Sequence, residues 1–137
     1  MATQPNCKAR INEALKGRIE DIEKLFRAYQ RGDEEQYSED IGTFNEYGLG
    51  FDYVAPHTFT DQRRGYFCYQ LSWGGPSDEF RFYVDEWLKP TRIEYWFLDW
   101  FDGAKKILSG QTYNLLAEIL DDFRECGLLQ EKLNEAR

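Results

Sequence analysis

Histidine is almost absent from the chain, and cysteine, proline and methionine are scarce. The single histidine, His57, excludes a metal site built from several histidines. The three cysteines, Cys7, Cys68 and Cys126, are far apart, and none belongs to a CxxC pair. We therefore predict neither a disulfide framework nor a zinc site, and reduced thiols in a cytoplasmic protein are the simpler interpretation.

Long apolar runs are missing as well. No stretch approaches the roughly 20 residues of a membrane span, and the first ten residues contain no apolar core of a signal peptide. The glycines form neither GxGxxG nor GxxxxGK[ST], and WGGP at 73–76 is typical of a turn. We expect a soluble protein that has no cofactor or metal site and does not contact a membrane.

Aromatic residues, by contrast, make up 17 % of the 137 residues. Each buries roughly 150–250 Å², so they supply the driving force that aliphatic residues supply elsewhere. The length is typical of one domain, and it suffices for a real core without disulfides. We therefore predict a single domain over residues 1–137.

Acidic residues give the chain a net charge of −8, and they are unevenly distributed. Residues 33–52 contain seven carboxylates and no lysine or arginine. An acidic protein is repelled by nucleic-acid phosphates, so direct binding to nucleic acid is not expected. The simplest role of the acidic run is solubility, whereas a functional alternative is imitation of phosphates towards a basic partner.

Apolar residues at three- and four-residue spacing predict a helix over 8–31, ending near Gly32, and another over 112–126. Weaker signals indicate a short helix over 34–41, a helical turn over 104–108, and a further helical turn or a frayed tail over 128–137. Between the long helices, alternation of period two predicts four strands. These strands are expected at 48–55, 64–73, 79–85 and 92–100.

Short links between these strands favour an antiparallel meander. The predicted fold is α+β, with an N-terminal helix, a four-stranded antiparallel sheet and a C-terminal helix packed on one face of the sheet. One sheet face is strongly apolar and should meet the helices; in strand 64–73 it carries Phe67, Tyr69, Leu71 and Trp73.

The other face is rich in tyrosine and half polar. It includes Tyr66, Arg81 and Tyr83 and is either a recognition surface or a solvated sheet face. The strand IEYWFLDW at 93–100 is apolar on both faces. A core position is the simpler interpretation of that strand, and an aromatic face exposed to a partner is the alternative.

Candidate catalytic groups are few. A pair of His57 and Cys68 is conceivable, but Cys68 lies among aromatic residues, where a thiol is usually inert. Asp99 and Asp102, with Glu94 nearby, suggest a two-acid hydrolase, although acids at strand ends commonly serve as caps or solvate an edge. We predict that the protein is not an enzyme.

The segments YGLGFDYV, HTFTDQRRGYF, YQLSWGGPSDEFRFYVD and RIEYWFLDWFDGAKKIL lie within residues 47–108. They resemble small uncharacterised acidic proteins of bacterial plasmids and integrative elements. Such elements often encode acidic inhibitors of host defence, including anti-restriction and anti-CRISPR proteins. The resemblance implies an inhibitor by association only, and it carries no residue roles.

The leading prediction is a non-enzymatic, acidic interaction protein of a mobile element that inhibits a nucleic-acid-handling host-defence complex. Its partner would be a protein with a basic surface, such as a nuclease, a restriction enzyme or a CRISPR effector. The predicted partner contacts are acids for charge and aromatic anchors: Glu34, Glu35, Glu39, Asp40, Glu46, Tyr66, Tyr83, Trp96 and Trp100.

Two alternatives stay open. The first is an immunity protein that neutralises a basic toxin, for which the same physics applies. The second is a small-ligand-binding or hydrolytic domain, which a closed pocket around Arg81, Tyr83 and Asp99 would favour. A flat or convex acidic surface would favour the inhibitor. The sequence does not define the oligomeric state.

Overall fold

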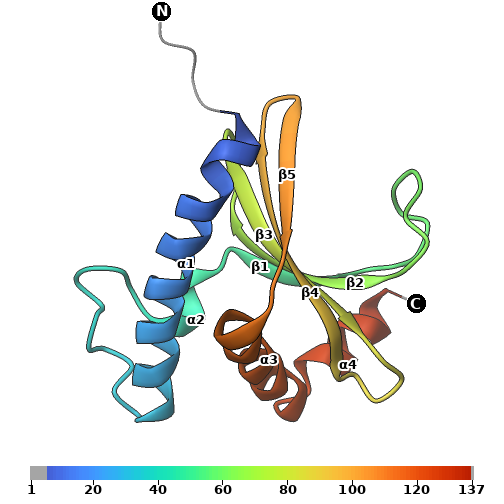
Figure 1. Cartoon of the computed structure of the whole chain (residues 1–137). Helices are drawn as coiled ribbons and strands as arrows, with labels where there is room; N and C mark the ends of the chain where they lie inside the picture. Colours follow the sequence, from blue (N-terminus) through green and yellow to red (C-terminus); the bar gives the residue numbers. More distant parts are fainter. Residues whose placement is uncertain (1–5, 137) are drawn as a thin grey trace, which may run out of the picture.

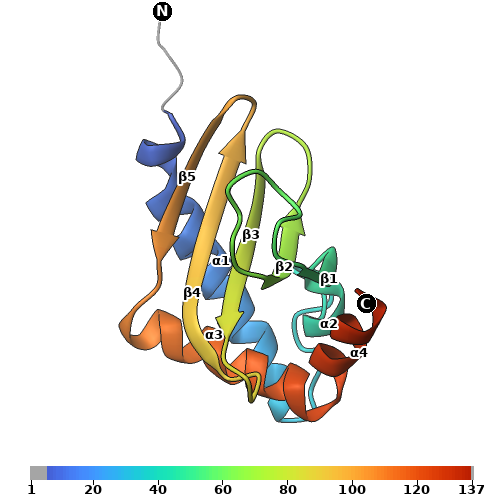
Figure 2. The same cartoon turned by 90° about the vertical axis from the view of Figure 1, so that its right-hand side faces the viewer.

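The computed structural model describes residues 6–136 and consists of one twisted antiparallel sheet with helices against one of its faces (Figures 1 and 2). The strands lie in the sheet in the order in which they follow in the chain. They are β1 (Gly50–Val54), β2 (Tyr66–Ser72), β3 (Ser77–Val84), β4 (Pro90–Asp99) and β5 (Asp102–Ile107). The predicted α+β class and antiparallel sheet are confirmed, but the sheet has five strands and not four.

The helices are α1 (Cys7–Gln30), α2 (Phe44–Tyr47), α3 (Gly110–Glu125) and α4 (Leu128–Glu135). The side chain of Asn6 caps α1 by accepting a hydrogen bond of 2.9 Å from the backbone N–H of Ala9. Gly32, just beyond the helix, has a φ of +77°. In Figure 2, α1 and α3 lie behind the sheet, and α1 contacts β4 and β5.

The core lies between these helices and the inner face of the sheet. Phe67, Phe80, Phe82, Ile93 and Tyr95 are fully or almost fully buried on that face. They pack against the apolar stripes of the helices, whose buried members include Ile22, Phe26, Leu116, Ile119 and Leu120. One face of the aromatic strand 93–100 is therefore core, whereas the other face carries Trp96 and Leu98, which are only partly buried.

A buried ion pair ties α1 to the sheet within this core. Asp78 is 3 % exposed and accepts hydrogen bonds from Arg18 Nε at 2.7 Å and Arg18 Nη2 at 2.9 Å. The hydroxyl groups of Tyr95, at 2.6 Å, and of Ser72 also donate to its carboxylate. Arg18 is the only basic partner of this carboxylate among residues 6–136, so the pair fixes where the helix crosses the sheet.

Two of the weaker helix predictions are wrong. Residues 34–41 form successive turns closed by hydrogen bonds between residues three apart, such as Gln36 N–H to the Asp33 carbonyl. The segment is too polar to pack a helical face, and isolated short helices are unstable in water. The short helix α2 follows instead, with Phe44 buried.

Residues 104–108 were predicted as a helical turn, but most of them belong to β5. The two-residue link Trp100–Phe101 makes a tight hairpin, in which Asp99 pairs with Asp102. Pairing with β4 continues to the pair of Glu94 and Ile107. Pairing with β4 thus overrides the good helix propensity of alanine and lysine.

Among residues 6–136, none of the helices combines the length and the apolar composition that crossing a membrane requires.

Candidate functional site

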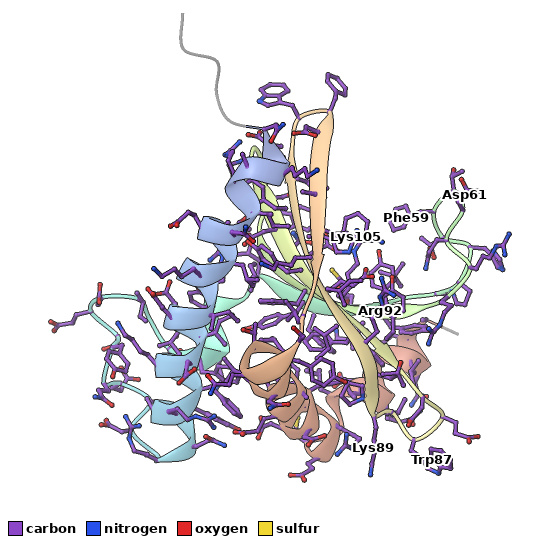
Figure 3. The ribbon with its side chains drawn as sticks, viewed as in Figure 1. Phe59, Asp61, Trp87, Lys89, Arg92 and Lys105 are labelled. Carbon is purple, nitrogen blue, oxygen red and sulfur yellow. The ribbon has the colours of Figure 1, made fainter. Side chains whose placement is uncertain are left out.

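The sheet face opposite the helices forms the floor of a cavity of about 770 Å³. The connection from β1 to β2, residues 55–65, extends away from the sheet beside this face (Figures 1 and 2). In Figure 3, Phe59 of this connection and Lys105 of β5 lie across the hollow from one another, and both line the cavity. The cavity is therefore bounded by three parts: the sheet, the connection and the edge strand.

Strand register builds the floor in rows across the sheet. One row consists of Asp52, Cys68, Arg81 and Glu94, which are successive partners on β1 to β4. The next row consists of Gln70, Glu79, Trp96 and Lys105 on β2 to β5. Because alternate residues of a strand share a face, residues far apart in the chain meet on this floor.

Arg81 lies at the centre of the floor. Its guanidinium carbon is 3.8 Å from the centroid of the Trp96 ring and 4.7 Å from that of Tyr66. Its Nε donates a hydrogen bond of 2.7 Å to Glu79 Oε2. Among residues 6–136, its terminal nitrogens, Nη1 and Nη2, donate to no acceptor. The guanidinium is thus held by three neighbours, and its two terminal nitrogens remain free to donate.

The carboxylates of the floor already have partners. Glu79 Oε2 accepts from Arg81 and from the Cys68 thiol, whose sulfur is 3.2 Å away. Glu94 is buried and accepts from Arg92 Nε at 2.6 Å and from the indole nitrogen of Trp96 at 2.9 Å. Both of these buried carboxylates are therefore held by donors within the protein, and Glu79 Oε1 alone of their oxygens accepts no hydrogen bond from residues 6–136.

Tyr66 contributes an unpaired hydroxyl. The residue is 2 % exposed and lines the cavity, yet its hydroxyl has no hydrogen-bond partner among residues 6–136. Burial raises the pKa of Tyr66 to about 12, against the opposing effect of the Arg81 charge. The hydroxyl is therefore protonated at neutral pH and is able to donate.

Cys68 and His57 do not form a catalytic pair. Burial is the largest cause that raises the pKa of the Cys68 thiol, and the negative charge of Glu79 adds to it. The thiol is therefore protonated and weakly nucleophilic. His57 belongs to the exposed connection and does not line the cavity, whose floor carries Cys68.

Asp99 and Asp102 do not reach the cavity either. Asp99 forms an ion pair of 2.5 Å with Arg10, and Asp102 accepts a hydrogen bond of 2.7 Å from the backbone N–H of Cys7. That hydrogen bond is the main cause that lowers the pKa of Asp102. Both acids hold the start of α1 against the β4–β5 hairpin, whereas Glu94 lies on the sheet face opposite the helices and lines a smaller cavity beside the main one.

The structure separates the predicted partner contacts into three groups. Tyr66, Tyr83 and Trp96 come together in the cavity lining, whereas Trp100 is 89 % exposed at the tip of the β4–β5 hairpin. The predicted acids are exposed in the connection between α1 and β1. In Figure 1 this connection lies beside α1, on the opposite side of the molecule from residues 55–65. These acids are Glu34, Glu35, Glu39, Asp40 and Glu46.

The prediction that Trp73 lies on the core face of strand 64–73 is wrong. The register between β2 and β3 shifts between Gln70 and Ser72, which ends the regular alternation before Trp73. Trp73 is 72 % exposed and lines the cavity, while Phe67, Tyr69 and Leu71 are core as expected. A bulge of this kind leaves no distinctive signal in the sequence.

The cavity face is locally basic although the chain is acidic. A shallower cavity of about 310 Å³ adjoins the main one and is lined by Arg63, Arg64 and Arg92. With Arg81 and Lys105, the two cavities hold five cationic side chains against four carboxylates, those of Asp52, Asp61, Glu79 and Glu94. Their local balance is +1, compared with −8 for the whole chain.

Among residues 6–136, no group of three or more His, Cys, Asp and Glu side chains is placed to hold a metal ion. No protein-family model matches the chain, and neither the curated proteins nor the solved structures provide a significant match.

Proposed function

We propose that this domain binds a small organic molecule in the cavity on the open sheet face. The observation that carries the proposal is that the Arg81 terminal nitrogens and the Tyr66 hydroxyl have no acceptor among residues 6–136 and lie at the base of an aromatic-lined cavity. Ligand sites are typically concave, about 300–1,000 Å³ in volume, and mostly apolar with a few convergent polar groups. This cavity has each of these features.

Binding without catalysis fits the chemistry of the floor. Both buried carboxylates are paired, and the only thiol in the lining is held protonated. No side chain there combines a free basic atom with a neighbouring nucleophile, which acyl or glycosyl transfer would need. The domain would therefore act as a receptor or carrier of its ligand.

Saturation-transfer NMR with a mixture of small aromatic fragments tests the proposal. The wild type and Trp96→Ala are compared, with Trp87→Ala as the matched control in the exposed turn between β3 and β4. Fragments should bind the wild type and the control, and binding to Trp96→Ala should weaken at least tenfold. Absence of any bound fragment, or equal binding to folded Trp96→Ala, would contradict the proposal.

A second candidate is the inhibitor of a basic, nucleic-acid-handling protein. The observation in its favour is that the five predicted acids are all exposed in one connection, where they are free to attract a basic surface at long range. The aromatic residues of the cavity would not share that surface, so such a partner would be held mainly by charge.

Capture from a nuclease-treated lysate of the source host, at low and high salt, tests this candidate. The wild type should retain a nuclease, restriction subunit or CRISPR effector at low salt only. The triple variant Glu34→Lys, Glu35→Lys, Glu39→Lys should lose it, whereas Tyr66→Phe should retain it. Equal capture by the wild type and the triple variant would contradict the mimicry hypothesis.

A further inference from the structure

We infer that the ligand of this cavity is an organic carboxylate with an apolar body. The inference rests on the proposed function and adds the chemical class of the ligand. Three features of the lining support it: the kind of hydrogen-bonding groups that remain free, the balance of charge, and the position of the apolar walls.

The free polar groups at the base of the cavity are donors. Nη1 and Nη2 of Arg81 and the Tyr66 hydroxyl have no acceptor among residues 6–136. The carboxylates of Glu79 and Glu94 already accept two hydrogen bonds each. The free donors at the base therefore favour a ligand group that accepts hydrogen bonds, and the two terminal nitrogens of a guanidinium match the two oxygens of a carboxylate.

The two adjoining cavities together favour a ligand with one negative charge. The main cavity alone holds two cationic side chains, Arg81 and Lys105, and three anionic ones, Asp52, Asp61 and Glu79. With Arg63, Arg64, Arg92 and Glu94 of the shallower cavity, the balance becomes +1. Glu79 already compensates part of the Arg81 charge at 2.7 Å. A carboxylate brings one negative charge, which matches the excess of one positive charge in the two cavities, whereas a phosphate dianion exceeds it.

The walls above the donors are apolar and stand open to solvent. Phe59, Trp73 and Leu49 each expose more than half of their surface at the rim, and Leu98 lines the same cavity. Large exposed apolar groups around a recess commonly mark a binding site, and a ligand body of aromatic size would cover them. The ligand is thus oriented with its carboxylate inward and its apolar body towards the rim.

Matched probes test the inference by isothermal titration calorimetry. The probes are 2-naphthoate and octanoate, each with its neutral amide, together with the cation 2-naphthylmethylammonium. We expect each carboxylate to bind at least tenfold more tightly than its amide, and the cation to bind most weakly. An amide or cation that binds as tightly as the acid would overturn the inference and leave the proposed function standing. Absence of binding by every probe would overturn both.

Variants then locate the carboxylate. Tyr66→Phe should weaken carboxylate binding about threefold to tenfold, the effect of one hydrogen bond. Arg81→Lys should weaken it about tenfold, because lysine cannot donate to both carboxylate oxygens from a planar guanidinium. Amide binding should change less than twofold in both. Tyr37→Phe and Arg31→Lys, matched changes outside the cavity lining, should have no effect. Equal losses for acid and amide, or no loss for the acid, would overturn the inference.

Discussion

The guanidinium carbon of Arg81 lies 3.8 Å from the centroid of the Trp96 ring, which belongs to the neighbouring strand. Glu79, and not Arg81, is the direct cross-strand partner of Trp96, so Arg81 and Trp96 are diagonal neighbours on one face. The contact holds the cation over an aromatic ring at the centre of the cavity. Its strength therefore determines how firmly the proposed binding group is positioned.

A double-mutant cycle should detect this contact. Arg81→Met, Trp96→Leu and the double variant are compared with the wild type by urea unfolding. We expect a favourable coupling free energy of about 0.5–2 kcal/mol, the range of partly buried cation–π pairs. The control cycle pairs Arg81→Met with Trp87→Leu, which lies outside the cavity lining and should show no coupling. A zero value for the first cycle would mean that the contact is not energetically significant.

Asp78 is predicted to be among the most sensitive positions for stability. Asp78→Asn removes the negative charge that faces Arg18 Nε and Nη2 within a buried network. Breaking a buried pair leaves an uncompensated charge and typically costs about 3–5 kcal/mol. Urea unfolding should show a loss of this size, whereas the exposed Asp33→Asn should change the unfolding free energy by less than about 0.5 kcal/mol. A loss of below about 1 kcal/mol at Asp78 would contradict the assigned role.

The three cysteines should differ in reactivity towards a thiol reagent such as DTNB at pH 8. Cys126 is exposed, whereas Cys7 is buried and burial raises its pKa. The pKa of Cys68 is also raised, by burial and by Glu79. One thiol should therefore react rapidly and the other two slowly, because the thiolate is the reactive form.

Cys126→Ser should remove the rapid phase, while Cys68→Ser should leave it unchanged. Raising the pH increases the thiolate fraction of each cysteine, so the slow phases should accelerate towards alkaline pH. A second thiol that reacts as rapidly as Cys126 in the folded protein would contradict the burial of Cys7 or the raised pKa of Cys68.

Local sequence patterns predicted the elements whose apolar residues recur at a regular spacing. The apolar stripe of α1 includes Ile11, Leu15 and Ile22, and it defines a helix before any tertiary contact is known. The strand β5 could not be found in this way. Its residues are exposed and mostly polar or small, so only the hairpin with β4 determines their conformation.

The candidate site was predictable in part. Alternation placed Tyr66, Arg81 and Tyr83 on the half-polar sheet face, which is the floor of the cavity. Phe59 and Lys105 belong to the site only because a connection and an edge strand approach one another in space. Sequence spacing carries no signal for such an approach. For the same reason, the sequence could not show that the five predicted acids within residues 34–46 lie apart from the aromatic residues of the cavity.

In the β4–β5 hairpin, Trp100 has a backbone conformation that is unfavourable for a residue with a side chain. It is the first residue of a two-residue link, and its φ of +56° lies in the left-handed region. Such a conformation costs an L-residue roughly 1–2 kcal/mol, whereas glycine adopts it readily and is preferred at this position of a hairpin. Because Trp100 is 89 % exposed, its side chain offsets little of this cost through packing.

Trp100→Gly should therefore raise the unfolding free energy by about 0.5–1 kcal/mol, after allowance for the greater freedom of glycine in the unfolded chain. Phe101→Gly is the matched control, since Phe101 is also fully exposed but is not among the residues with positive φ. The control should gain no stability, because glycine there adds only unfolded-state freedom. Urea unfolding of both variants measures the difference. A loss of stability in Trp100→Gly that equals the loss in Phe101→Gly would show that the hairpin is not strained at Trp100.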